Sequence, residues 1–336
     1  MTYELTLLPG DGIGPEVSDA TVAVLAASGV DIHWLRMPAG AGAVDSHGTP
    51  LPDQTLRTIE RTRVALKGPI TTPVGTGFTS VNVAIRQALD LYVSLRPVRS
   101  IPGIQTRHDN VDLVIFRENT EGLYAGREHE PVPGVVETLR VITEAACNRI
   151  CRWASTWARA EGRQSLTLVH KATIMKLSDG LFLNAFGKIA DEYPFLRHND
   201  MLVDDVVREL VLDPTQFDCL VMENLYGDVL SDLAAGLVGG LGVVPGANIG
   251  DRYAVFEAVH GSAPDIAGKG VANPTALIQS AVLMLRHIGE RAAADRVERA
   301  LLQVLAAGQV RTGDLGGRAT TIEFQNAIIA AMQEAA

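Results

Sequence analysis

The sequence is poor in cysteine, short of positive charge and without a long apolar run. Its three cysteines are an odd number, and Cys147 and Cys151 lie one helical turn apart. We therefore expect buried thiols rather than zinc ligands or a disulfide framework. The net charge of −10 argues against nucleic acid or an anionic membrane as a partner. The longest uncharged run, 233–250, is rich in glycine and contains Pro245, which argues against a membrane span.

The N-terminus also lacks the basic and apolar stretches of a signal peptide. Low cysteine use fits a reducing compartment, so we expect a cytoplasmic protein. A length of 336 residues with 47% hydrophobic residues suggests about two domains, or one two-lobed unit with a sizeable core.

Predicted strands alternate with predicted helices along the chain, which indicates an α/β fold. The predicted strands are 3–8, 64–66, 112–116, 138–143, 166–169, 201–203 and 217–223. Two predicted helices end near residues 27 and 161, and four others span residues 80–92, 273–289, 291–307 and 321–334. Ligands in such folds bind beyond the carboxyl ends of strands. Four ionisable residues lie at or just past such ends: Arg117, Lys171, Asp204 and Asp228.

Asp228 and Asp232 are four residues apart, after the predicted strand 217–223. If a helix begins near Gly227, both carboxylates lie on one face, one turn apart. Such a pair is typical of a Mg²⁺ or Mn²⁺ site completed by waters and substrate oxygens. The alternative is a pair of helix-capping aspartates.

The segment Pro9–Glu16 places glycines between the first strand and the first helix. Its order, G-D-G-I-G, is not the GxGxxG of a dinucleotide-binding turn, and Pro15 stands where the helix should open. A tight turn after an edge strand explains it equally well.

Three segments resemble the decarboxylating β-hydroxyacid dehydrogenases, the family of isocitrate, 3-isopropylmalate and homoisocitrate dehydrogenases. They are 9–16, 224–242 and 257–274, and the likeness continues to 315–321. The resemblance implies a two-domain α/β fold that is not a Rossmann fold. It implies a large nucleotide-binding domain of residues 1–95 and 240–336. A smaller domain, 96–239, would be inserted and carry the metal, the catalytic residues and the dimer interface, with a clasp near 127–142.

The resemblance also implies the chemistry. A 3-carboxy-2-hydroxyacid is oxidised by a nicotinamide cofactor and then loses CO₂, with Mg²⁺ or Mn²⁺ as Lewis acid. By resemblance, Asp228 and Asp232 are metal ligands, and Asp204 is the third, contributed by the partner subunit of a homodimer or a multiple of it. Tyr124 matches the general acid, and Lys171 the base-side residue, again from the partner. The substrate arginines are Arg86, Arg96 and Arg117.

Unperturbed tyrosine and lysine pKa values, about 10 and 10.4, suit neutral acid–base chemistry poorly. We expect the arginines, the metal and partial burial to move the pKa values of Tyr124 and Lys171, and their titrations to be coupled.

Ser80 and Asn82, two apart before Arg86, resemble the pair with which isocitrate enzymes bind the γ-carboxylate. Ser80 alone could be a helix cap. The family-atypical residues Thr79, Thr173, Asp205 and Arg208 leave open another 3-substituted malate: homoisocitrate, 3-isopropylmalate or a phosphonate analogue of isocitrate.

Asp265 and Ile266 match the NAD-dependent members, since a carboxylate accepts hydrogen bonds from ribose hydroxyls and repels a 2′-phosphate. Further cofactor contacts by resemblance are Thr71, Thr72, His260, Gly261, Ala263 and Asn273. The resemblance implies an NAD-dependent isocitrate dehydrogenase of the tricarboxylic acid cycle. A non-catalytic regulatory subunit is the second hypothesis, which the complete acid, base and metal set disfavours.

Overall fold

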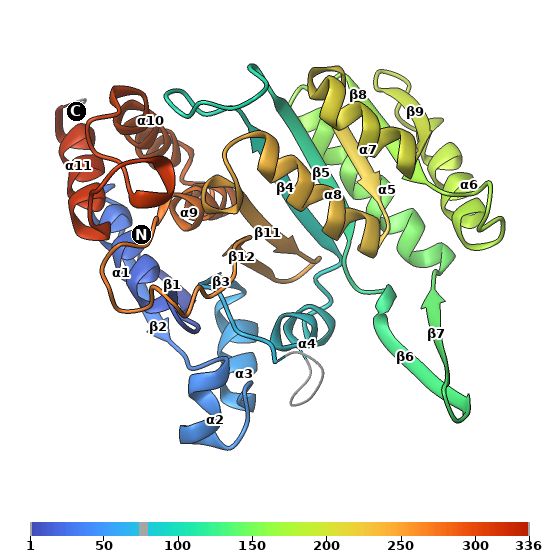
Figure 1. Ribbon diagram of the computed structural model, residues 1–336, viewed down its shortest axis with the longest axis horizontal. Coiled ribbons are helices and arrows are strands. Elements are labelled where there is room, and N and C mark those ends of the chain that lie inside the picture. The colour runs from blue at the N-terminus through green and yellow to red at the C-terminus, as the bar shows by residue number, and fades with distance from the viewer. Residues whose placement is uncertain (1, 74–79, 335–336) are drawn as a thin grey trace.

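The computed structural model describes residues 2–73 and 80–334, which form one large mixed sheet with helices on both faces (Figure 1). The sheet has ten strands in the order β2-β1-β3-β12-β11-β4-β5-β10-β8-β9. Their bounds are β1 Tyr3–Leu8, β2 Ile32–Arg36, β3 Val64–Lys67, β4 Val93–Arg99, β5 Asp112–Glu118, β8 Ser165–His170, β9 Arg197–Leu202, β10 Cys219–Met222, β11 Pro245–Ile249 and β12 Ala254–Ala258. The fold is therefore α/β, as predicted.

Two parallel flanks meet at an antiparallel centre. Strands β2, β1, β3 and β12 are mutually parallel, and so are β5, β10, β8 and β9. Strands β11 and β4 join the flanks through antiparallel pairing. Because three successive antiparallel pairings separate them, the two flanks run in opposite directions, and their carboxyl ends lie at opposite edges of the sheet.

Eleven α-helices are present in the described part of the chain. They are α1 Gly14–Ala27, α2 Ala41–His47, α3 Asp53–Thr62, α4 Val81–Ala88, α5 Glu144–Ala160, α6 Ser178–Ala190, α7 Val203–Leu212, α8 Asn224–Leu237, α9 Thr275–His287, α10 Arg291–Ala307 and α11 Thr321–Glu334. Helix α8 crosses one face of β4 and β5, and α5 covers the other (Figure 1). No helix within these residues combines the length and hydropathy needed to cross a membrane.

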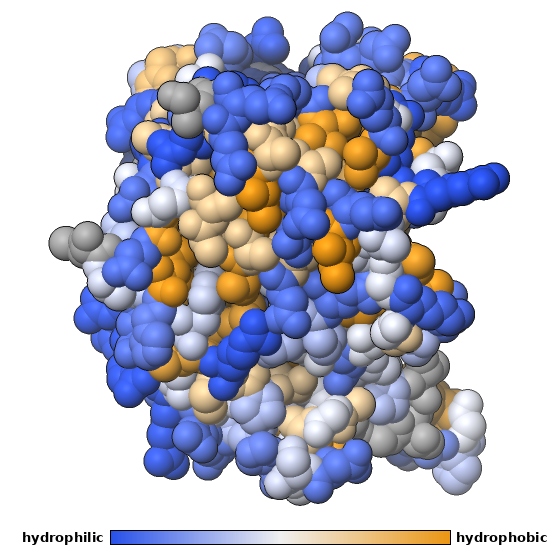
Figure 2. Space-filling view, turned by 90° about the vertical axis from the view of Figure 1, so that its left-hand side faces the viewer, coloured by the Kyte–Doolittle hydropathy of each residue, from blue (hydrophilic) through white to orange (hydrophobic). Residues whose placement is uncertain are grey.

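The core follows from the continuously apolar strands, which are buried on both faces. Phe116 on β5 is fully buried and packs edge-to-face against Trp153 and Trp157 of α5, with ring centroids 5.9 and 5.4 Å apart. All three cysteines are free and buried. Figure 2 shows a side of the molecule where hydrophilic residues dominate, with apolar ones interspersed, as on an ordinary protein surface.

Most predicted elements are confirmed, with two corrections. Helix α8 begins at Asn224, earlier than predicted, because the Glu223 carboxylate accepts the Tyr226 N–H at 2.9 Å and caps it. The predicted helix 80–92 ends earlier, at Ala88, and β4 follows from Val93 to Arg99. Pro97 lies beyond the part of β4 that pairs with β11, so its missing N–H breaks no bond to that strand.

The predicted strand 138–143 lies outside the large sheet. It belongs to a separate hairpin of β6 (Gly122–Val132) and β7 (Val135–Val141), which projects from the body (Figure 1). Several of its apolar side chains are exposed, including Val132, Val136 and Leu139. Its role as a dimer clasp remains a prediction. So does the domain division, whose boundary after residue 95 falls inside β4.

Candidate active site

A cavity of about 250 Å³ opens over the centre of the sheet, where side chains of β3, β4, β5 and β12 line it. It brings together most of the predicted substrate, metal and catalytic residues, which come from five elements: α4, β4, β5, β6 and α8. Its predicted members are Ser80, Asn82, Arg86, Arg96, Arg117, Tyr124, Asp228, Asp232, His260 and Gly261, and it also contains Lys67 and Glu257.

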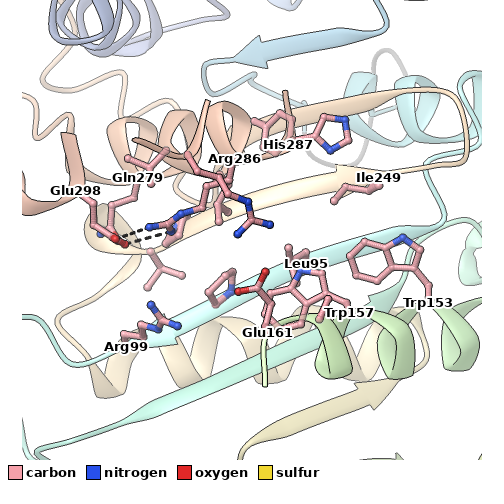
Figure 3. Close-up of a pocket in the computed structure, with 18 of the residues that line it drawn as sticks. Leu95, Arg99, Trp153, Trp157, Glu161, Ile249, Gln279, Arg286, His287 and Glu298 are labelled. Carbon is pink, nitrogen blue, oxygen red and sulfur yellow. Dashed lines mark hydrogen bonds and ion pairs between the residues drawn. The ribbon is translucent and has the colours of Figure 1, made fainter. Parts of the chain in front are cut away.

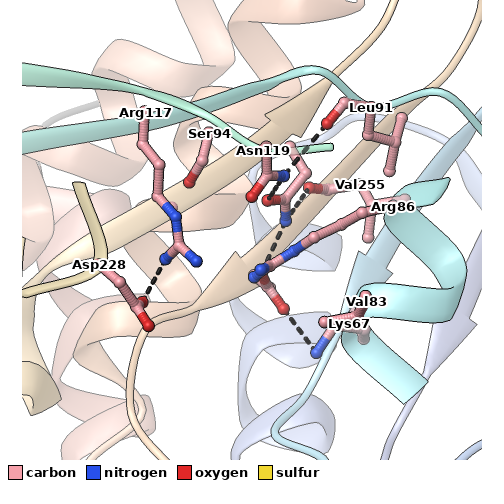
Figure 4. Close-up of polar contacts among 12 residues, drawn as sticks. Lys67, Val83, Arg86, Leu91, Ser94, Arg117, Asn119, Asp228 and Val255 are labelled. Atoms are coloured by element: carbon pink, nitrogen blue, oxygen red, sulfur yellow. Dashed lines mark hydrogen bonds and ion pairs between the residues drawn. The ribbon is translucent and has the colours of Figure 1, made fainter. Parts of the chain in front are cut away.

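A buried carboxylate, Glu257 of β12, organises the cations of this cavity. Figure 4 shows the side chains of Lys67 and Arg86 converging in this region. Its oxygens lie 2.6 Å from the Lys67 ammonium, 3.1 Å from the Arg86 guanidinium and 3.7 Å from that of Arg96. Burial alone would raise the pKa of Glu257, but Lys67, Arg86 and Arg96 outweigh it and hold the pKa far below its usual range. Burial lowers the pKa of Arg96 to about 10, partly offset by Glu257.

Arg117 and Tyr124 both donate to the Asp228 carboxylate, one to each oxygen. The Arg117 Nε also donates to Asn224 Oδ1 at 2.8 Å, so the guanidinium is fixed at two points. Gly227 makes this possible, because a Cβ there would lie 2.5 Å from the Arg117 side chain. Burial and the hydrogen bond to Asp228 raise the pKa of Tyr124 to about 12, away from neutrality.

The negative charges of the two α8 carboxylates, Asp228 and Asp232, favour the binding of a divalent cation. Burial, and then the neighbouring charge of Asp228, raise the pKa of Asp232 above its usual range. A cation between the two would relieve that repulsion, and carboxylate oxygens are what Mg²⁺ and Mn²⁺ prefer. Across the described ranges, no three acidic, histidine or cysteine side chains come close enough to hold a metal.

Lys171 and Asp204 lie outside the cavity and form an ion pair with each other. The Lys171 hydrogen bond lowers the pKa of Asp204. Within one chain the structure therefore does not bring Lys171 to Tyr124, nor Asp204 to Asp228. This separation is what the resemblance implies if both residues serve a second protomer.

Ser80 caps α4, with its hydroxyl 3.5 Å from the Val83 N–H, and it also faces the cavity. The helix-cap interpretation of this serine is confirmed, and its role in binding a substrate carboxylate stays a prediction. Asn82 Oδ1, Arg86 Nε and Arg96 Nη1 are buried there without a hydrogen-bond partner. Unpaired buried polar atoms lining a cavity are expected where a polar ligand completes the bonding. Thr79 lies outside the described residues.

Thr71 and Thr72 lie on the loop after β3, next to the cavity. The Thr71 hydroxyl lies 2.7 Å from that of Ser262, and Thr72 donates weakly to Ser80 at 3.4 Å. The Thr71 N–H binds the carboxylate of Asp11, which also accepts from the backbone of α2. The glycine loop 9–16 is thus a structural support, and a Cβ on Gly10 would clash with Pro69 O at 2.1 Å.

The other predicted cofactor residues lie on the segment 260–273. The His260 side chain is partly buried, which lowers its pKa, and its Nδ1 lies 2.9 Å from Gly261 O. Asn273 is occupied structurally, because its amide binds Asp314 at 2.8 Å and the start of α9 at 3.0 Å. Asp265 is exposed, and Ala263 and Ile266 are partly exposed, beyond the cavity lining.

The family-atypical residues have local explanations. Asp205 and Arg208 pair with each other at 2.8 Å on α7, so their charges compensate. Thr173 is exposed in the loop after β8. Neither the pair nor Thr173 lines the cavity.

A larger cavity, about 540 Å³, lies on the opposite face of the sheet between α5 and α9 (Figure 3). Leu95 and Pro97 of β4 face it, whereas Arg96 faces the candidate site, as strand alternation requires. Its Arg286 binds Glu298 at 2.6 Å and Asp295 at 3.0 Å. With indole walls and its own charges partly paired, it does not offer the convergent polar groups of the smaller cavity.

Comparisons with known proteins agree with this geometry. The sequence model of the family described as isocitrate/isopropylmalate dehydrogenase matches residues 4–328. The chain belongs to the isocitrate/isopropylmalate dehydrogenase family. The crystal structure of isocitrate dehydrogenase from Methylococcus capsulatus superposes with a TM-score of 0.96 at 50% identity, covering 98% of this chain and 99% of that one.

Two curated relatives belong to NAD isocitrate dehydrogenases. One, named as regulatory and found in Dictyostelium discoideum, is 46% identical over 98% of this chain and 92% of its own length. The other, named as catalytic and found in Arabidopsis thaliana, is 48% identical over 96% of this chain and 87% of its own length. Family membership supports an enzyme of the decarboxylating dehydrogenase class. The expectation of a cytoplasmic protein is wrong by this comparison, because both relatives are named as mitochondrial.

Sequence reasoning missed four acidic or basic residues that hold the site together. Lys67 and Glu257 form its buried ion pair, while Asp11 and Glu16 anchor the loops around it. The Glu16 carboxylate accepts the N–H groups of Gly270 and Ala272 at 3.2 and 2.8 Å. A charged residue inside or directly after an apolar strand was the available signal for Lys67 and Glu257.

Replacing Glu257 by Gln should destabilise the protein, because three cations lose their buried counter-charge. We expect a loss of about 3–5 kcal/mol in the free energy of unfolding at pH 7, measured by urea denaturation. The folded-state pKa of Glu257 lies below its ordinary 4.5. Its stabilising contribution is therefore complete above that value and is lost as the pH falls below it.

The difference in stability between wild type and Glu257→Gln should accordingly shrink as the pH drops below about 4.5. Glu60→Gln, at an exposed position of α3, is the matched control and should leave stability unchanged. Equal stability of Glu257→Gln and wild type at pH 7 would contradict the assigned network.

Proposed function

We propose that the protein catalyses the NAD-dependent oxidative decarboxylation of isocitrate to 2-oxoglutarate with Mg²⁺ or Mn²⁺. The observation that carries this proposal is the convergence of three arginines, Tyr124 and two α8 carboxylates on one cavity with unpaired polar atoms. The family membership and the NAD isocitrate dehydrogenase relatives support it.

The positively charged residues of the cavity would bind the substrate. Arg86, Arg96 and Arg117 would hold the substrate carboxylates, since guanidinium groups bind carboxylates in bidentate pairs. Arg117 is already aimed by Asn224, which limits the reorganisation needed on binding. Ser80 and Asn82 at the start of α4 would bind the remaining carboxylate and so select isocitrate.

Tyr124 would act as the general acid, and its hydroxyl already points at Asp228. A divalent cation held by Asp228 and Asp232 would supply Lewis-acid stabilisation of the negative charge that develops on the substrate. Lys171 and Asp204 would complete the site of a partner protomer, so that a homodimer is the smallest active unit. Asp265 and Ile266 would select NAD through the ribose.

A regulatory, non-catalytic role is the alternative, favoured by the similarity to the Dictyostelium regulatory protein. The chain nevertheless retains Tyr124, Lys171, Asp204, Asp228 and Asp232, which a protein without chemistry does not need. Another 3-substituted malate remains the alternative substrate, since the family also includes isopropylmalate enzymes.

The decisive assay measures NADH formation with Mn²⁺ and NAD on isocitrate, 3-isopropylmalate, homoisocitrate and malate. We expect kcat/KM for isocitrate to exceed that for 3-isopropylmalate and malate by at least about a hundredfold, because Ser80 and Asn82 can pair the extra carboxylate. Homoisocitrate carries the same carboxylate one methylene further out, so we expect its kcat/KM to be lower by at least about tenfold. Absence of turnover on all four would favour the regulatory alternative. Preference for another substrate would overturn the assignment of Ser80 and Asn82.

Asp228→Asn should reduce Mn²⁺-dependent turnover by more than about a hundredfold, since it removes both a metal ligand and the acceptor of Tyr124. Direct titration with Mn²⁺, followed by electron paramagnetic resonance, should show weaker binding. Asp191→Asn, exposed at the end of α6, serves as control. Unchanged Mn²⁺ affinity in Asp228→Asn would overturn the metal assignment.

The double variant Asp265→Lys, Ile266→Tyr should raise the ratio of kcat/KM for NADP over NAD by at least about tenfold, because a cation replaces the carboxylate that repels the 2′-phosphate. Asp45→Lys, which adds the same charge on exposed α2, should leave the ratio unchanged. An unaltered ratio in the double variant would argue against the ribose contact.

A further inference from the structure

Arg140, at the base of the β6/β7 hairpin, joins three elements of the molecule. Its Nη1 lies 2.6 Å from Asp179 Oδ1 and 3.3 Å from Ser178 Oγ at the start of α6. Its Nε lies 3.5 Å from Glu223 Oε2, and the guanidinium sits 5.3 Å above the Tyr226 ring at the start of α8. The side chain is 14% exposed, so these contacts are largely shielded from water.

The contact of Arg140 with Asp179 forms the first arm of this network, the Lys171 arm, because it connects Arg140 to Lys171. Asp179 is buried, and its second oxygen accepts the backbone N–H of Lys171 at 2.6 Å. One carboxylate therefore connects the Arg140 guanidinium with the main chain at the end of β8. The direction in which the Lys171 side chain leaves the sheet depends on this connection.

The contact of Arg140 with Glu223 forms the second arm, the α8 arm, because it connects Arg140 to the helix that carries the predicted metal ligands. Glu223 is buried and caps α8 through Oε1, while Oε2 has no hydrogen-bond partner. A buried carboxylate is costly unless a cation compensates it. Within the described part of the chain, Arg140 is the only Lys or Arg within 4.0 Å of either Glu223 or Asp179. Asp228 and Asp232 lie further along the helix that Glu223 caps.

We propose that Arg140 is a positioning residue that aligns Lys171 through Asp179 and the α8 carboxylates through Glu223. This inference rests on the proposed function, in which Lys171 serves the partner's site and Asp228 and Asp232 serve their own. One guanidinium at the foot of the hairpin thereby sets elements of both sites of a dimer. Val132, Val136 and Leu139 of the same hairpin are exposed, and under the proposed function they would contact the partner protomer.

The chemistry requires arginine. A planar guanidinium carries donors in several directions and can lie over an aromatic ring while reaching two carboxylates. A lysine ammonium keeps the charge but cannot span Asp179 and Glu223 in the same way. Arg140→Gln should therefore lose both arms, whereas Arg140→Lys should recover part of the function.

The first test is Mn²⁺ affinity, measured by electron paramagnetic resonance on the full-length protein without substrate. We expect Arg140→Gln to weaken Mn²⁺ binding by about tenfold, as loss of supporting contacts around a metal site does. Arg140→Lys should fall between Arg140→Gln and wild type. Arg152→Gln, which breaks an exposed ion pair with Glu192, is the matched control and should bind Mn²⁺ like wild type. Wild-type Mn²⁺ affinity in Arg140→Gln would overturn the α8 arm and with it the proposal.

The second test separates the two arms in mixed dimers. A Lys171→Met chain combined with an Asp228→Asn chain retains one complete shared site. In the first placement, Arg140→Gln is added to the Lys171→Met chain and disturbs the α8 side of that site. In the second placement, it is added to the Asp228→Asn chain and disturbs the Lys171 side. We expect kcat to fall by about tenfold in both placements, with a shifted pH profile of kcat only in the second.

Unchanged kcat and pH profile in the second placement would overturn the Lys171 arm. Failure of the proposed function looks different. If the proposed function is wrong, the wild-type protein does not turn over isocitrate, or the mixed dimer without any Arg140 substitution is inactive. The Mn²⁺ affinities of the Arg140 variants would still show whether Arg140 positions α8.

Discussion

A single buried carboxylate sets the conditions for the rest of the site. Glu257 is almost inaccessible to water, and its charge is tolerated only because Lys67, Arg86 and Arg96 surround it. The same arrangement keeps two arginines at the cavity wall in extended, fixed positions. An incoming substrate carboxylate therefore meets cations that are already desolvated and oriented, which lowers the cost of binding.

The antiparallel centre of the sheet makes this cluster possible. Strand β4 carries Arg96 and β12 carries Glu257, and β11 separates the two. Asn119 and Asn248 extend the polar chain across the same strands, with Asn119 donating to Asn248 at 2.9 Å and Asn248 to Glu257 at 2.6 Å. Alternation along β4 leaves the reverse face apolar, where the larger cavity lies. One strand thus serves two environments.

Sequence patterns predicted the elements well and the connections between them less well. Apolar residues at helical spacing predicted α4, the sequence also predicted α1, α5, α9, α10 and α11, and the residues of the cavity follow from motif resemblance. The start of α8 was misplaced because its cap is a glutamate, an uncommon capping residue that gives no local signal. Glu257 and Arg140 escaped notice because their partners are distant in sequence, and only the fold brings them together.

The neighbouring positions of β3 and β12 have a consequence for how the chain is made. Strand β3 ends at Lys67, and its partner begins only at Ala254. While the ribosome is still translating the middle of the chain, one edge of β3 remains unpaired and the Lys67 ammonium has no carboxylate to meet. Closure of so long a loop is slow, and an open strand edge invites association with other chains. The β1–β3 segment should therefore be more prone to association with other chains before β12 is made than in the finished sheet.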